Sequence, residues 1–223
     1  MTDPASNQPQ GPAAPAMDII AQRGDSVTSL SEDHGFFWET IWNHDKNTSL
    51  KSLRKDPNII APGDKVHFPD RILKWEDRAT EAKHTFKKKG VPAMLKLSLK
   101  RLGKPRADEP YVLEIDGQLI SGTTSSQGVL ETPISPNARY ATLKFNNGTE
   151  RYSIQIGGLD PIETDAGVRQ RLKNLGYTVA NIDGPLTDPD AIDAIKRFQY
   201  RQNLPVDGVA SEQTRSALKD AHC

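Results

Sequence analysis

VRQRLKNLGYTVANIDGPLTDPDAIDAIKRFQYRQNLPVDG, residues 168–208, is the stretch that decides the fold of the C-terminal part of the chain. Apolar residues recur at helical spacing before Gly176 and again before Asn203, which predicts two amphipathic helices joined by a turn. Asp188 or Asp190 is placed to cap the second helix, and Ser211 to cap a third that runs through Leu218. The residues expected to face inward are Val168, Leu172, Leu175, Ile192, Ile195 and Phe198.

The same stretch contains a short internal repeat. Asp183-Gly184 and Asp207-Gly208 each follow an apolar residue after a helix, and each precedes a capped helix. Asp-Gly pairs are typical of turns, because glycine adopts backbone angles that other residues avoid. The self-similarity indicates one supersecondary unit used twice.

These motifs resemble the peptidoglycan-binding domain 1 family, and the resemblance covers residues 161–222. It implies a three-helix fold that binds peptidoglycan. Polar groups near the helix starts are the candidates for contact with the wall, although a structural role for each stays open; they are Gln199, Arg201, Gln202 and Asp207. The residues that carry the resemblance are 168–177, Asp183-Gly184, 195–199, 203–208 and Thr214.

A second pattern occupies residues 18–69, near the other end of the chain. A short strand from Asp18 is followed by a turn, and Ser26 is placed to cap a helix. A second short helix is expected over residues 37–42, and the turn at residues 61–64 leads into a closing strand. The order is strand, helix, helix, strand.

That order, with Gly24-Asp25-Ser26-Val27, residues 41–43 and residues 57–66, resembles the LysM family. The resemblance implies a shallow groove for N-acetylglucosamine glycans between two loops. The candidate glycan-binding residues on those loops are Gly24, Asp25, Ser26, Val27, Asn58, Ile59, Ile60, Pro62 and Gly63. The connection 44–56 is longer than usual for the family and is expected to be able to cover the groove. A LysM-like fold that docks proteins is therefore the alternative.

The middle of the chain, residues 71–160, alternates between apolar and polar residues as β-strands do. Asp116-Gly117 predicts one hairpin turn, and Asn146-Asn147-Gly148 predicts a second. About six short strands favour a small antiparallel β-sandwich. Residues 84–92, 110–117, 122–128 and 157–161 resemble the transthyretin-like domain found with spike components of type VI secretion systems.

The sequence offers no credible catalytic set. His84 is the only histidine of the middle region, and Cys223, the only cysteine, is the last residue. A zinc peptidase needs three protein ligands, and a cysteine peptidase needs an internal nucleophile. Glu109 and Glu114 can be proposed as a glycosidase pair, but lone carboxylates are most often solvated. We therefore expect no enzyme activity, no metal and no cofactor.

Charge is unevenly spread along a chain whose net charge is zero. Residues 71–106 carry twelve basic and three acidic side chains, a net charge of +9. Such a segment can meet an anionic polymer or an acidic partner, and the alternative is a solvated strand edge protected by lysines. No apolar run is long enough for a membrane helix. Residues 1–17 lack the features of a secretory signal and are typical of a disordered tail.

The sequence predicts a multidomain α+β protein with four parts: a tail (1–17), a LysM-like βααβ domain (18–70), an antiparallel β-sandwich (71–160) and a three-helix peptidoglycan-binding domain (161–223). We expect a non-catalytic peptidoglycan-binding adaptor, made in the cytoplasm and acting in the cell envelope. Export by a contractile injection apparatus would add spike or effector proteins as partners, whereas no membrane or nucleic acid is expected. The alternatives are a wall hydrolase with two anchors and a structural assembly protein.

Overall fold

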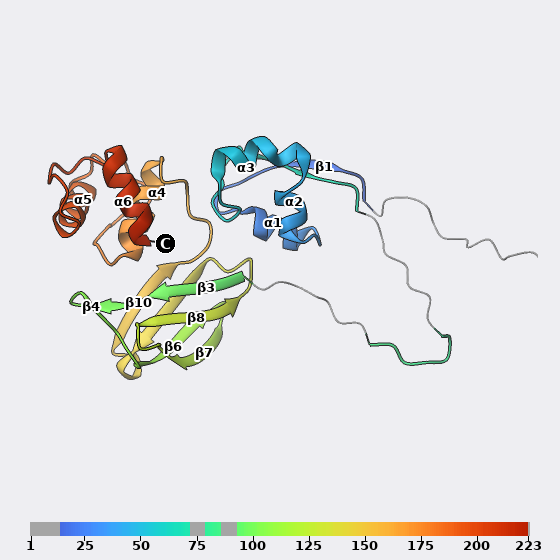
Figure 1. The fold of residues 1–223 in the computed structure, drawn as a ribbon, viewed down its shortest axis with the longest axis horizontal. Coiled ribbons are helices and arrows are strands. Elements are labelled where there is room, and N and C mark those ends of the chain that lie inside the picture. The colour runs from blue at the N-terminus through green and yellow to red at the C-terminus, as the bar shows by residue number, and fades with distance from the viewer. Residues whose placement is uncertain (1–13, 72–78, 86–92, 223) are drawn as a thin grey trace, which may run out of the picture.

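The computed structural model describes residues 14–71, 79–85 and 93–222, and its elements form an α+β architecture (Figure 1). Three hydrophobic clusters lie in the N-terminal region (14–71), the middle region (93–160) and the C-terminal region (161–222). The N-terminal and C-terminal regions lie on the same side of the middle strands in Figure 1. Most of the predicted tail, part of the basic segment (72–78 and 86–92) and Cys223 lie outside the described residues.

In the N-terminal region, two antiparallel strands and three helices enclose one core. Its elements are β1 Met17–Ile20, α1 Val27–Asp33, α2 Trp38–Trp42, the 3-10 helix η1 Asp45–Asn47, α3 Thr48–Arg54 and β2 Lys65–Phe68. Ser26 caps α1 as predicted: its hydroxyl accepts from the Ser29 amide at 2.9 Å, and the Ser29 hydroxyl accepts from the Ser26 amide. This reciprocal pair satisfies two amides at the start of the helix.

The segment 44–56 is helical, so the region has one helix more than the predicted order. Asn47 is buried at the start of α3, and its amide nitrogen donates to the carbonyls of Ile41 and His67, each at 2.8 Å. Its amide oxygen accepts from the His67 amide at 2.8 Å. One side chain therefore ties α2, α3 and β2 together, because its polar atoms all find partners inside the fold.

The middle region consists of two main sheets that share one core. A four-stranded antiparallel sheet has the order β10-β9-β6-β7, and β3 pairs with β8. Leu95 and Leu130 from the smaller sheet pack with Leu113, Leu143 and Phe145 from the larger one. The strands are β3 Ala93–Ser98, β4 Lys100–Arg101, β5 Lys104–Pro105, β6 Pro110–Ile115, β7 Gln118–Thr123, β8 Val129–Ile134, β9 Tyr140–Phe145 and β10 Glu150–Gln155.

Both predicted hairpins are confirmed. Asp116 and Gly117 have φ values of 49° and 76°, as a two-residue turn of type I′ requires, and they join β6 to β7. A 3-10 turn, η2 (Asn146–Gly148), joins β9 to β10, and all three of its residues have positive φ.

The C-terminal region contains the three expected helices: α4 Asp165–Asn174, α5 Pro189–Arg201 and α6 Glu212–His222. Asp188 occupies the cap position of α5, but its carboxylate makes no capping hydrogen bond. Ser211 accepts from the Thr214 amide at 3.3 Å, and α6 continues beyond Leu218. The core includes the predicted Val168, Leu172, Ile195 and Phe198, with Leu175 at its edge.

Candidate functional site

A surface groove of about 460 Å³ lies between the end of α4 and the outer face of α5. We call it the tyrosine groove, and six side chains give it its chemistry: Tyr177, Asp193, Lys196, Arg197, Tyr200 and Arg201. Tyr200 is 76% exposed, which is unusual for an aromatic side chain of this size. Exposed tyrosines favour binding sites, because the ring gives a broad apolar face and a polar tip at a low entropic cost.

The floor and walls of the groove are fixed by packing. Tyr177 follows the turn that ends α4 at Gly176, and its ring packs edge-on against the buried Phe198, with ring centroids 6.1 Å apart. The guanidinium of Arg201 lies over the Tyr177 ring, 5.4 Å from its centre. A cation over an aromatic face is held by the ring quadrupole, so the core residue Phe198 indirectly positions Arg201.

Gln199 is buried, so the expectation that it is exposed is wrong, and its contacts favour the structural role that the sequence left open. Its amide nitrogen lies within hydrogen-bond distance of Asp207 Oδ1, the Val209 carbonyl and Thr214 Oγ1, at 2.7, 3.0 and 3.1 Å. Its oxygen accepts from the amides of Asp207 and Gly208 at 3.1 and 2.9 Å. Gln199 therefore fixes the turn that joins α5 to α6.

The other three candidates of this region are exposed. Arg201 lines the tyrosine groove, whereas Gln202 lies at the C-terminal cap of α5 and does not line it. The Asp207 carboxylate accepts from the Val209 amide at 2.8 Å and from Gln199. These two hydrogen bonds lower the pKa of Asp207, since they favour the ionised form.

The role of Arg169, which is fully buried in α4, was not predicted from the sequence. Its guanidinium donates to the carbonyls of Asn181 and Pro185, the latter at 2.6 Å, and to Asp190 at 2.9 Å. It therefore organises the first Asp-Gly turn as Gln199 organises the second. The signal was present, because Arg169 lies next to Val168 in the apolar pattern and Asp190 supplies the opposite charge.

The structure divides the predicted glycan-binding loops of the N-terminal region. Ser26, Val27 and Ile60 are buried, and Gly24, Asp25 and Ile59 are half-buried. Asn58, Pro62 and Gly63 are exposed. The two loops contact each other directly: the Val27 amide donates to the Pro57 carbonyl at 2.8 Å, and the Thr28 hydroxyl donates to Asn58 Oδ1 at 2.7 Å. The two loops therefore lie side by side, but only one of them presents exposed candidate residues.

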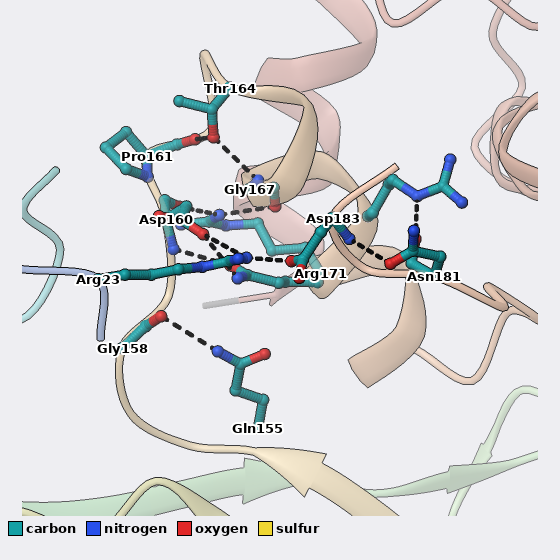
Figure 2. A network of polar contacts seen from close by, with 12 residues as sticks. Arg23, Gln155, Gly158, Asp160, Pro161, Thr164, Gly167, Arg171, Asn181 and Asp183 are labelled. Carbon is teal, nitrogen blue, oxygen red and sulfur yellow. Dashed lines mark hydrogen bonds and ion pairs between the residues drawn. The ribbon is translucent and has the colours of Figure 1, made fainter. Parts of the chain in front are cut away.

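A polar network links Arg23, the residue before Gly24, to Asp160 and Asp183 (Figure 2). Arg23 forms an ion pair with Asp183 of the C-terminal region and lies 3.7 Å from Asp160, which is buried at the end of the middle region. The hydrogen bond from Arg23 lowers the pKa of Asp183. Gly158 packs so closely on Gly24 that a Cβ atom at Gly158 would lie 2.6 Å from the Gly24 Cα. We call these contacts of Arg23 and Gly24 the clasp.

The middle region pairs its candidate carboxylates with cations. Glu109 lies 2.6 Å from Arg106, and Glu114 lies 2.7 Å from Lys144. Arg106, one of the cations of the basic segment, is buried, and its guanidinium lies 3.8 Å from the centre of the Phe145 ring. Lys96, Lys100 and Lys104 are exposed, as are Arg71, Lys83 and Arg101.

Two broader features of the structure bear on the site. Among residues 14–71, 79–85 and 93–222, no cluster of three or more His, Cys, Asp or Glu side chains is arranged to hold a metal ion. Within the same residues, no helix has the length and apolar character needed to cross a bilayer.

The helices and turns of the C-terminal region define a small three-helix module. Residues 167–218 match the family model described as "Putative peptidoglycan binding domain", which spans α4, α5, α6 and both Asp-Gly turns. The tyrosine groove lies within this match. No curated protein and no solved structure matches the chain. A peptidoglycan-binding module at this end associates the chain with the cell wall.

Proposed function

We propose that the protein binds peptidoglycan without cleaving it, and that the tyrosine groove is the contact surface. The observation that carries the proposal is the coincidence of the groove with the matched residues 167–218. The exposed Tyr200 and the positioned Arg201 give that groove an aromatic face and a cation. Single modules of this size bind weakly, in a range of micromolar to millimolar dissociation constants that corresponds to roughly 4 to 8 kcal/mol.

Co-sedimentation of the full chain with purified sacculi tests this proposal. We expect retention that falls about tenfold in the Tyr200→Ala variant, because burial of an aromatic anchor typically supplies more than 1 kcal/mol. Val209→Ala is the matched control, since Val209 is 58% exposed on the same module and does not line the groove. Retention that is absent, or that responds equally to both variants, contradicts the proposal.

The absence of cleavage has its own measurement. We expect no release of dye from labelled sacculi, because each of the candidate carboxylates Glu109 and Glu114 is paired with its own cation, Arg106 and Lys144 respectively. Dye release by the wild type that disappears in Glu114→Gln would instead favour the hydrolase alternative. Glu114 is suited to this test because it is paired with Lys144, so its substitution leaves the buried Arg106 undisturbed.

The role of the N-terminal region is a second proposal, which rests on its LysM resemblance. We propose that glycans reach it at the exposed loop of Asn58, Pro62 and Gly63, since the clasp covers the loop of Gly24. Titration of the full chain with soluble chitin oligomers, followed by amide chemical shifts, would then perturb residues 58–63. If residues 58–63 stay unperturbed, the region is a docking element, and α3 is the first place to seek a protein partner.

We further propose that the protein acts as part of a larger apparatus. The resemblance of the middle region to spike-associated domains supports an adaptor of a contractile injection system. Affinity capture of the full chain on purified spike proteins tests it. The Tyr200→Ala variant is the control and should be captured equally well, because the tyrosine groove is assigned to the wall and not to the spike. Equal capture of the chain on an unrelated immobilised protein would contradict the adaptor role, while the proposal of wall binding would stand.

A further inference from the structure

The tyrosine groove carries an excess of positive charge. Lys196, Arg197 and Arg201 line it together with one acid, Asp193. Asp193 is already paired with Arg197, with 2.8 Å between Oδ2 and Nε. Neither Lys196 nor Arg201 has an acidic partner among the residues that the structure describes. Two cations therefore remain available to a ligand.

Helical spacing places these groups in two rows on α5. Asp193, Arg197 and Arg201 are four residues apart, and Lys196 and Tyr200 are also four apart, so the two rows run side by side on the face of α5 that lines the groove. Arg201 is held above the Tyr177 ring, and that ring is held by the buried Phe198. A guanidinium that is already positioned can donate two parallel hydrogen bonds to a carboxylate with little further loss of entropy.

Peptidoglycan offers two chemically different surfaces to such a groove. Its glycan strand presents hydroxyl and acetamido groups and carries no charge where the lactyl groups are substituted with peptide. Its stem peptides present free carboxylates beside the small methyl groups of alanine. A neutral sugar offers no anionic group to pair with Lys196 and Arg201, whereas the carboxylates of a stem peptide do. Two available cations beside two tyrosine faces fit the peptide better.

We infer that the tyrosine groove binds the carboxylate-bearing stem peptide of peptidoglycan, with Arg201 and Lys196 on the carboxylates and Tyr200 over the alanine methyl groups. This inference rests on the proposed function, because it names the part of the wall that the same groove contacts. It also assigns Arg201 a role in specificity, and it makes binding sensitive to salt, since ion pairs at an exposed groove are screened.

Competition for retention of the full chain on sacculi tests the inference. The three competitors are a synthetic stem pentapeptide with free carboxylates, the same peptide with every carboxylate amidated, and neutral chitin oligomers. We expect the free peptide to release the protein at a concentration at least tenfold lower than the amidated one. Chitin oligomers should leave the contribution of the groove, measured as the difference between wild type and Tyr200→Ala, unchanged.

Variants separate a charged contact from a general loss of structure. Arg201→Gln keeps an amide donor but removes the charge, and it should reduce competition by the free peptide about tenfold while leaving the weak effect of the amidated peptide unchanged. Lys219→Gln is the control, since it removes an exposed cation from α6 outside the groove. Unaltered helical circular dichroism shows that each variant is folded.

The outcomes distinguish the two levels of the proposal. Retention that depends on Tyr200 but is released by chitin oligomers, or equally by both peptides, overturns the stem-peptide inference and leaves wall binding standing. Retention that does not depend on Tyr200 overturns the proposed function, and the inference with it. Release by the free peptide alone, lost in Arg201→Gln and kept in Lys219→Gln, establishes the inference.

Discussion

At the scale of single residues, the amide of Gln199 holds the second Asp-Gly turn by contacts to three acceptors and two donors. It is 1% exposed, so water cannot replace partners that are lost. An unsatisfied buried polar group costs about 1–3 kcal/mol, and several would be left by one truncation.

Gln199→Ala should therefore lower the free energy of unfolding by roughly 2–4 kcal/mol, because it leaves buried turn amides without an acceptor and removes packed volume. Urea denaturation of the full chain, followed by helical circular dichroism, measures the change. Gln202→Ala is the matched control at an exposed position of the same helix end and should change stability by less than about 0.5 kcal/mol. Similar midpoints for the two variants would contradict the assigned role.

At the scale of elements, α6 ends at a histidine that contacts α4. The Nε2 atom of His222 lies 3.0 Å from the Asn174 amide nitrogen, and Asn174 in turn exchanges hydrogen bonds with Gln155 of β10 at 2.8 and 3.0 Å. Burial, and then the nearby positive charge of Arg171, lower the pKa of His222 to about 4. With the Asn174 amide as donor, the histidine nitrogen must accept, so the contact needs the neutral ring.

This contact should weaken in acid. His222 is neutral in both states above its unfolded pKa near 6.5, and its contribution is lost as the pH falls through the folded value of about 4. The difference corresponds to roughly 3 kcal/mol. We expect the wild type to lose stability from pH 6.5 to 4 more steeply than His222→Gln, in thermal unfolding at matched ionic strength. Parallel curves would show that His222 is protonated or exposed in the folded protein.

At the scale of the whole molecule, the clasp joins regions that are far apart in the sequence. Arg23 and Asp183 are about half exposed, with 50% and 48% of their side chains open to solvent. An ion pair at that exposure contributes at most about 1 kcal/mol. The backbone contact between Gly24 and Gly158 is shielded, so we assign it the larger part of the association.

Gly158→Ala should separate the regions, because the new Cβ would lie 2.6 Å from the Gly24 Cα and the backbone at Gly158 has a φ of 65°. Gly117→Ala is the matched control: φ is 76° there, and nothing lies within 4 Å of the added atom. We expect faster hydrogen exchange of residues 24–27 and a larger radius of gyration in Gly158→Ala alone. Equal behaviour of the two variants would show that the clasp does not hold the regions together.

The sequence by itself determined the features that depend on residues close together in the chain. Helical periodicity predicted the three C-terminal helices, Ser26 predicted the cap of α1, and Asp116-Gly117 predicted the hairpin between β6 and β7. These features could be predicted because caps, turns and amphipathic faces are set by local backbone angles. These local signals were strong because each needs only a few neighbours to be satisfied.

Only the tertiary structure decided which polar residues are buried and which loops stay open. Glutamine is a residue type that is usually exposed. Gln199 is buried because the turn at 207–209 folds back to supply its hydrogen-bond partners. Tyr177 and Tyr200 form a groove because α4 and α5 meet, and Gly24 is covered because Gly158 packs on it from more than a hundred positions away. Burial depends on which surfaces meet, and no local pattern specifies that choice.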